Sequence, residues 1–217
     1  MFTHVLRCRL RIVDRAWEHF GDGLAPLRDA GKLGAVMLQF PPWFTAKKAN
    51  RSYLEAVADR LPGVQLAVEL RHGSWMGDGD QERTLALLER LGLGYVCVDE
   101  PQGFKSSVPP VTACTAGIAV VRFHGRNAEN WHKRNISAAE RFRYLYDDDE
   151  LREWVEPIRR LDDQAGETHV LMNNCYQDYG VRNARDIARL LGEGLQPQSG
   201  AHAPATAGHQ LDQRAQS

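Results

Sequence analysis

The sequence predicts an α/β fold of the (β/α)8 barrel type, in which about five of the strands are present and a disordered tail follows. Short apolar runs alternate with segments of helical periodicity, which indicates parallel strands joined by right-handed crossovers. Each run also ends in polar residues, as expected where strands deliver side chains to the mouth of a barrel. The five runs are Ala35–Phe40, Gln65–Leu70, Gly94–Val98, Ala119–Phe123 and Thr168–Met172.

An open, doubly wound sheet is the competing prediction, because five strands would complete it, whereas a barrel needs eight strands and roughly 250 residues. The phase of the strand residues favours the barrel. Side chains two apart share a face, so we expect Glu69, Asp99 and Arg122 on a mixed face that fills a barrel interior and opens at its rim. The opposite face, with Val68 and Val98, is apolar, as expected under covering helices.

Helices are expected where apolar residues recur at spacings of three and four. The first should break or bend near Gly21–Gly23, and Thr45 should cap the second. Residues 100–118 are rich in proline and glycine and should form an irregular crossover, with a further helix or two before the last strand. The segment Gly194–Ser217 has almost no large apolar residue and should be disordered, which leaves a domain over residues 1–193. The predicted helices cover residues 12–29, 46–61, 80–91, 149–165 and 180–192.

The composition favours one globular domain in the cytoplasm. The chain has 217 residues, 43% of them hydrophobic, which is enough to bury a full core. A formal net charge of -1 gives no general sign of nucleic-acid binding, although a local basic patch would still permit it. No apolar run reaches the length of a membrane helix, and no secretory signal begins the chain. The cysteines lack a CxxC pair and are expected to be free thiols: Cys8, Cys97, Cys114 and Cys175.

Six motifs follow one another along the chain: Lys32–Pro42, Ala67–Trp75, Val98–Pro101, Val121–Arg126, Tyr144–Trp154 and Met172–Asn174. Together they resemble the YecE-like family (DUF 72), a domain of unknown function with a TIM-barrel fold. The resemblance extends from about residue 1 to 192 and implies the barrel without a settled reaction. Members of that family begin with further strands upstream of a Thr-His pair similar to Thr3-His4, so the resemblance implies that three strands are missing here.

Polar residues at or just after the strand ends supply the candidate functional residues. The candidates for proton transfer are Glu69, Asp99 and His124, because a carboxylate can act as a general base and histidine titrates near neutral pH. The candidates for substrate binding carry guanidinium, amide, imidazole or indole groups. They are Gln39, Arg71, His72, Trp75, Arg122, Arg126, Asn173 and Asn174.

Each candidate also has a structural interpretation. Glu69 and Arg71 can form an ion pair inside the barrel, Asp99 can cap the following turn, and Trp75 can pack beneath its loop. A metal held by Glu69, Asp99 and His124 would suit the ligand preferences of Mn, Zn or Mg, but sequence spacing does not establish such a site. No cofactor motif and no oligomeric state follow from the sequence.

Alternation along Val121–Arg126 predicts that Arg122, His124 and Arg126 point to one side. Two buried guanidinium groups need counter-charge. If Glu69 and Asp99 supply it, the cluster is structural; if a phosphate or carboxylate ligand supplies it, the cluster is a binding site.

The leading functional hypothesis is an isomerase-like or hydrolase-like enzyme that acts at the strand rim on a phosphorylated or hydroxyl-rich small molecule. One alternative is a nucleic-acid or nucleotide binder in which the rim arginines hold phosphates and Trp75 or Trp131 stacks on bases. Another is an inactive, N-terminally truncated fragment.

Overall fold

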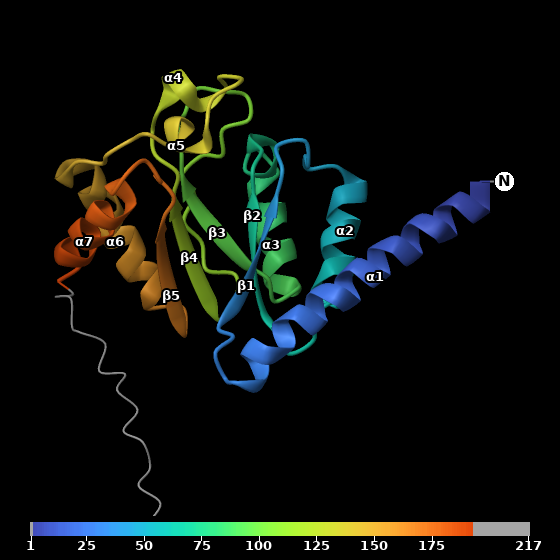
Figure 1. The fold of residues 1–217 in the computed structure, drawn as a ribbon. Helices are drawn as coiled ribbons and strands as arrows, with labels where there is room; N and C mark the ends of the chain where they lie inside the picture. The colour runs from blue at the N-terminus through green and yellow to red at the C-terminus, as the bar shows by residue number, and fades with distance from the viewer. Residues whose placement is uncertain (1, 193–217) are drawn as a thin grey trace, which may run out of the picture.

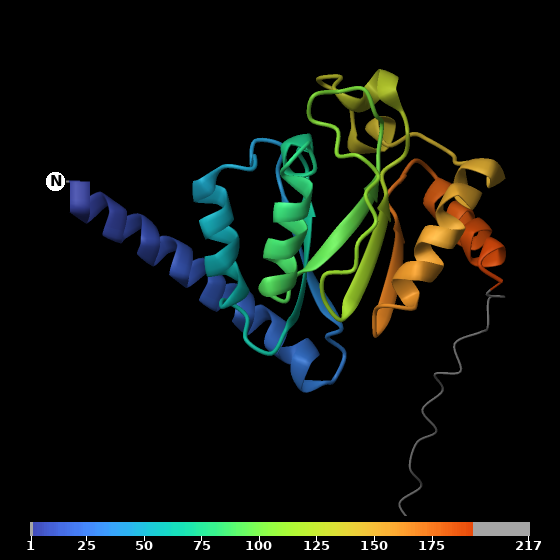
Figure 2. The same cartoon turned by 180° about the vertical axis from the view of Figure 1, so that it is seen from behind.

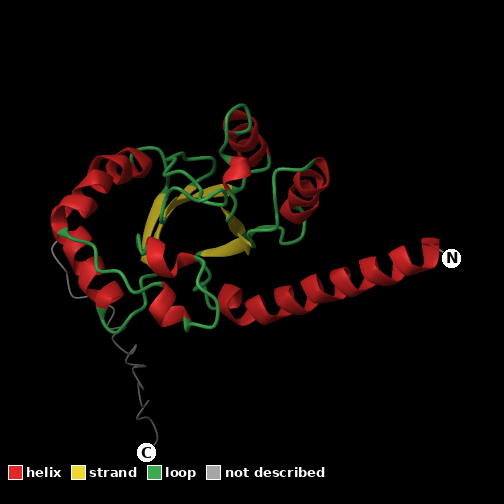
Figure 3. Ribbon diagram, turned by 90° about the horizontal axis from the view of Figure 1, so that it is seen from above, coloured by secondary structure: helices red, strands yellow, loops and turns green. Residues whose placement is uncertain are grey.

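The fold is given by a computed structural model that describes residues 2–192, and the side chains from Val13 onward. Five parallel strands form one sheet in the order β1-β2-β3-β4-β5, and helices lie between all successive strands except β3 and β4 (Figure 1). The sheet curls into a half-barrel, which confirms the predicted α/β class (Figure 3). The predicted disordered segment 194–217 lies outside the described residues. The strands are β1 Ala35–Phe40, β2 Gln65–Leu70, β3 Gly94–Asp99, β4 Ile118–Phe123 and β5 Glu167–Met172.

The longer helices lie outside the curve of the sheet (Figure 3). Helices α2 and α3 cover the end of the sheet that holds β1 and β2, while α6 and α7 pack beside β4 and β5 (Figure 2). Two short helices, α4 and α5, lie above the carboxyl ends of the strands (Figure 1). Residues 100–117 contain no helix, as predicted. The helices are α1 Phe2–Asp29, α2 Lys48–Ala58, the 3-10 turn η1 Gly73–Trp75, α3 Gln81–Arg90, α4 Ala128–Trp131, α5 Ala138–Arg141, α6 Asp148–Asp162 and α7 Tyr179–Leu190.

Two local predictions about the first helices are wrong. Helix α1 runs unbroken through Gly21–Gly23 and begins at Phe2, because packing of Trp17 and Leu24 against the core outweighs the roughly 1 kcal/mol that each glycine costs a helix. Thr45 does not cap α2. The N-cap is Lys47, whose side chain makes no capping hydrogen bond, while the Thr45 hydroxyl is buried and has no hydrogen-bond partner among the described residues.

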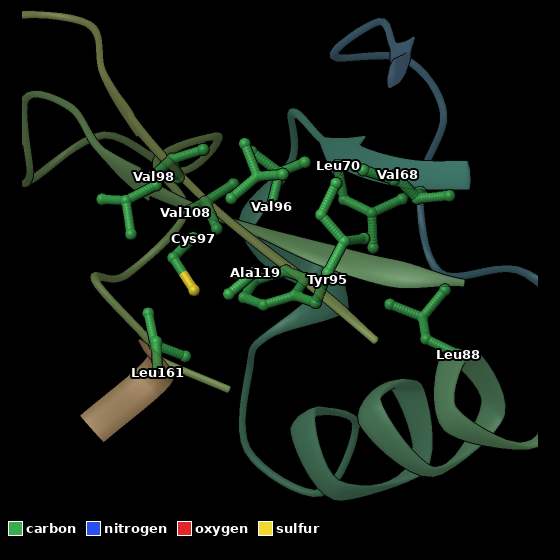
Figure 4. Close-up of a cluster of buried hydrophobic side chains, with 14 of the residues drawn as sticks. Val68, Leu70, Leu88, Tyr95, Val96, Cys97, Val98, Val108, Ala119 and Leu161 are labelled. Atoms are coloured by element: carbon green, nitrogen blue, oxygen red, sulfur yellow. The ribbon is translucent and has the colours of Figure 1, made fainter. Parts of the chain in front are cut away.

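The apolar core lies between the convex face of the sheet and the helices that cover it (Figure 4). Tyr95 and Cys97 of β3 point to this side, where Leu88 of α3 and Leu161 of α6 meet them. Cys97 is a free thiol, as are Cys114 and Cys175; the side chain of Cys8 lies outside the described part. Burial raises the pKa of the Cys97 thiol to about 12, so this cysteine acts as a packing residue.

The concave face is exposed at its edges, whereas Ala67, Val96 and Val120 near its centre are buried. Within residues 2–192, β1 and β5 each have a neighbouring strand on one side only, so the sheet curls without closing. Leu171 on β5 is 41% exposed because its concave surface has no opposing strand. None of the described helices is both long and apolar enough to cross a lipid bilayer.

Candidate functional site

Two polar networks lie at the carboxyl ends of the strands, on opposite faces of the sheet. The register pairs Gln39 with Glu69, and Val98 with Arg122, so Glu69 and Arg122 point to the concave side together with Val98. Asp99 is one residue further along β3 and therefore points to the convex side, beneath the helices. We name the concave group the Glu69 network: Gln39, Glu69, Arg71, Arg122, His124 and Asn173.

Glu69 is the centre of the concave network and has no exposed surface. Its Oε1 accepts hydrogen bonds from His124 Nε2 at 3.0 Å and from Arg71 Nη1 at 3.1 Å. Its Oε2 accepts one from Arg122 Nη1 at 2.5 Å. Arg122 Nη1 also donates to Gln39 Oε1 at 2.7 Å, so side chains from β1, β2 and β4 are joined around this carboxylate.

Asn173 completes the network and fixes the histidine tautomer. Its Nδ2 donates to His124 Nδ1 at 2.9 Å, and its Oδ1 accepts from Arg122 Nη2 at 3.0 Å. His124 Nδ1 is then the acceptor and Nε2–H the donor to Glu69. The histidine is fully buried, and both of its ring nitrogens are engaged.

The electrostatics of this network set the protonation states. Burial disfavours ionised Glu69, but the hydrogen bond from His124 and the charges of Arg122 and Arg71 outweigh it and lower the pKa of the carboxyl to about 2. Burial also disfavours a charged His124, and so do the positive charges of Arg71 and Arg122. Together these effects outweigh the hydrogen bond to Glu69, so the pKa of His124 falls to about 4. Near neutral pH Glu69 is an anion and His124 is neutral. A carboxylate with so low a pKa is a weak general base, which favours a positioning role for Glu69.

The convex network surrounds Asp99. Its carboxylate accepts hydrogen bonds from Tyr146 Oη at 2.6 Å, Trp154 Nε1 at 2.8 Å and Arg126 Nη2 at 2.7 Å. Arg126 also donates to Glu153 at 2.7 Å. These contacts join the ends of β3 and β4 to helix α6. We name this group the Asp99 network: Asp99, Arg126, Tyr146, Glu153 and Trp154.

The structure corrects two expectations about these residues. Arg122, His124 and Arg126 do not point to one side, because β4 ends at Phe123 and Gly125 adopts a φ of 85°, which ends the alternation. Glu69, Asp99 and His124 do not converge either. Among the described residues, no three histidine, cysteine or acidic side chains form a group that could hold a metal ion. The arginines are paired internally, Arg122 with Glu69 and Arg126 with Asp99.

A cleft of about 260 Å³ adjoins the Glu69 network at the carboxyl rim; we call it the rim cleft. Arg71 belongs to both the Glu69 network and the rim cleft. Its guanidinium contacts Glu69, and its Cζ also lies 5.3 Å from the centroid of the Trp131 ring. Arg141 reaches the cleft from α5 and is held by the backbone carbonyl groups of Trp131 and Lys133. The cleft thus presents two guanidinium groups and an indole. Its lining residues are Pro42, Arg71, Glu100, Ser106, Trp131, His132 and Arg141.

Glu100 is a cleft residue that the sequence reasoning did not select. It follows β3 directly and is 3% exposed. Its Oε1 accepts from the Val108 amide at 2.8 Å, and its Oε2 lies 3.3 Å from Arg71 Nη2. Burial raises the pKa of Glu100, against the opposing influence of Arg71 and the Val108 amide. Phase within β3 places Glu100 on the same face as Val98, but the sequence predicted that face to lie under the helices and Asp99 to lie in the interior. The register, which pairs Val98 with Arg122, shows that the expectation for β3 was wrong.

Three predicted binding residues belong neither to the two networks nor to the rim cleft. The His72 Nδ1 accepts from the Ser74 amide at 3.1 Å and caps the turn η1. Trp75 has no exposed surface and donates to the Phe44 carbonyl at 2.6 Å, so its ring is part of the core. Asn174 is also buried and binds the Tyr144 carbonyl at 2.9 Å. Their contacts are those of residues that hold loops in place.

The chain is similar to several proteins of one kind. The family model described as "Protein of unknown function DUF72" matches residues 1–208. The UPF0759 protein YunF of Bacillus subtilis is 33% identical over 183 residues, which are 82% of this chain and 64% of YunF. Two similar solved structures are DUF72 family proteins. The one from Enterococcus faecalis has a TM-score of 0.78 at 28% identity, covering 84% of this chain and 67% of the other. The one from Thermotoga maritima has a TM-score of 0.75 at 34% identity, with 83% and 66% covered.

Proposed function

This chain belongs to the DUF72 family of proteins of unknown function, and we propose that it carries the site of an enzyme that acts on a small oxyanion-bearing, hydroxyl-rich molecule. The site is the rim cleft, with the Glu69 network behind it. Enzymes built on parallel barrels hold their substrates at the carboxyl ends of the strands, where this cleft lies. The chain spans 64% of the length of YunF, so the remaining part of such a protein would contribute to the complete site.

The observation that carries the proposal is the placement of Arg71. Its guanidinium joins fully buried Glu69 to a cleft that contains a second guanidinium, Arg141. The single charge of Glu69 is shared between Arg71 and Arg122, and Arg141 adds a third guanidinium, so positive charge exceeds negative charge among these groups even when Glu100 is ionised. An oxyanion of a substrate would supply the balance through charge-assisted hydrogen bonds.

The proposed roles follow from the contacts. Arg71 and Arg141 bind the anionic group, and Ser106 and His132 offer polar groups to substrate hydroxyls. Glu69 orients Arg71 and the neutral His124 and does not itself move a proton, because its pKa is too low for that task. The reaction class is proton transfer or hydrolysis, in which the arginines neutralise charge that develops in the transition state.

The test is calorimetric titration of the full chain with inorganic phosphate and with sugar phosphates. Arg71→Lys retains the charge but loses the planar fork, and should weaken binding by about tenfold or more, the scale of a charge-assisted hydrogen bond. Arg152→Lys is the matched control, since Arg152 is exposed on α6 and, within the part of the chain that the structure describes, pairs only with Asp148 and Asp149. Its affinity should equal that of the parent.

Two results would contradict the proposal. One is a parent chain that binds none of these ligands, and the other is an Arg71→Lys variant that folds normally and binds as well as the parent. Polynucleotide binding that weakens steeply with salt and ignores Arg71→Lys would favour a nucleic-acid binder instead.

A further inference from the structure

We propose that the rim cleft binds an oxyanion and a proton together, and that Glu100 carries the proton. The inference rests on the proposed function, because it concerns the same cleft, and it specifies the ligand: an oxyanion that presents a hydrogen-bond acceptor to a protonated carboxyl group. In the absence of such a ligand Glu100 exchanges its proton with solvent.

The geometry of Glu100 motivates the proposal. Its side chain lines the cleft, yet it is 3% exposed, so its carboxyl group is almost completely removed from bulk water. One oxygen, Oε1, has a partner in the Val108 amide. The other, Oε2, is buried and makes no hydrogen bond with any described residue, although Arg71 lies 3.3 Å away.

A buried carboxylate oxygen without a hydrogen bond is costly as an anion. Protonation removes the charge and turns Oε2 into a donor, which then needs an acceptor. An oxyanion held in the cleft by Arg71 and Arg141 would provide one. Ligand binding would therefore raise the affinity of Glu100 for its proton, and protonation of Glu100 would raise the affinity of the cleft for the ligand.

The charged groups around Glu100 act in both directions, and burial adds to those that favour protonation. Arg71 and Glu69 face it from β2, Asp99 precedes it on β3, and the segment of α4 and α5 contributes His132 and Arg141 to the cleft. Of these, Arg71 opposes protonation, while Glu69 and Asp99 favour it together with burial, and the net result is a raised pKa of Glu100 in the free protein. A bound oxyanion neutralises Arg71 and adds negative charge, which raises the Glu100 pKa further. The affinity for the anion should thus fall as the pH rises.

The experiment is calorimetric titration with sulfate, which does not change its own protonation between about pH 5 and 8, in buffers of different ionisation enthalpy. The parent should take up as much as about one proton per sulfate, with affinity falling by up to about tenfold per pH unit once free Glu100 is ionised. Glu100→Gln should bind sulfate without proton uptake and with a nearly flat pH profile. His132→Asn is the matched control for the other titratable cleft residue and should retain the uptake.

The outcomes separate this inference from the proposed function. A parent that binds neither sulfate, nor phosphate, nor the sugar phosphates overturns both. Sulfate binding with the same proton uptake in Glu100→Gln, or with uptake lost in His132→Asn, overturns only the role of Glu100. If Glu100→Gln fails to fold, a pH titration of the parent can be followed by the carbon-13 resonance of the Glu100 carboxyl group. The titration midpoint should lie above pH 4.5 and rise when sulfate is added. A midpoint that does not change with sulfate refutes the proposal.

Discussion

Replacing Glu69 with glutamine removes one negative charge from a side chain that has no exposed surface, while keeping its size and one carbonyl oxygen. Arg71 and Arg122 would lose their shared buried counter-charge, and His124 would lose a charged acceptor. Removing one partner of a buried ion pair is more costly than its contact energy suggests, because the remaining charge stays desolvated.

The magnitude follows from the pKa of Glu69. A fall from the ordinary value of 4.5 to about 2 corresponds to about 3 kcal/mol of preferential stabilisation of the ionised folded form. Because the folded-state pKa is depressed, this stabilisation is present above pH 4.5 and is lost as the pH falls from 4.5 toward 2. We therefore expect Glu69→Gln to lower the free energy of unfolding by about 3 kcal/mol at neutral pH, and the difference from the parent to shrink below pH 4.5.

Urea denaturation of the parent and the variant at several pH values measures this difference. Glu156→Gln is the matched control, since Glu156 pairs with Arg159 at 2.7 Å but is 66% exposed. Exposed pairs contribute roughly 0–1 kcal/mol, so the control should lose little. A loss for Glu69→Gln as small as that of the control, or one that does not depend on pH, would refute the account of the Glu69 network.

Three further predictions concern the other network, the turn after β4 and the histidine. Asp99→Asn should lower the free energy of unfolding by about 3 kcal/mol in urea denaturation, and a loss below about 1 kcal/mol would contradict the contacts described. Gly125→Ala should destabilise the fold by at least about 1 kcal/mol more than Gly79→Ala. Both glycines have a positive φ, 85° and 78°, but a Cβ at Gly125 would lie 2.8 Å from the Tyr144 Cβ, whereas a Cβ at Gly79 would meet open space. Equal thermal midpoints for the two variants would refute this. The His124 ring should remain neutral in NMR titration down to its pKa of about 4, and a midpoint near 6.5 would show that the ring is not buried as described.

Much of the fold could be predicted because strand and helix signals are local. The predicted strands Ala35–Phe40 and Gln65–Leu70 have the bounds found in the structure, and β4 begins one residue earlier than expected. The break expected near Gly21–Gly23 was wrong because tertiary packing of α1 overrides the local preference of glycine.

The placement of the candidate site was harder to predict. Alternation along Val121–Phe123 correctly indicates that Arg122 lies opposite its neighbours, but it cannot extend past Gly125, whose positive φ turns Arg126 toward Asp99. Glu100 escaped notice because its neighbours in the site, such as Arg141, come from segments distant in the sequence.

The sequence by itself determined the five strands, the helices between them and the polar residues at the strand ends, because burial imposes a period of two on strands and 3.6 on helices. It also determined which residues share a face within one strand. Only the tertiary structure decided which face of each strand is concave, because that depends on the register between strands, which pairs Val98 with Arg122 and so sends Asp99 to the helices and Glu100 to the cleft. A register is set by backbone hydrogen bonds and packing over the whole sheet, and no single strand encodes it.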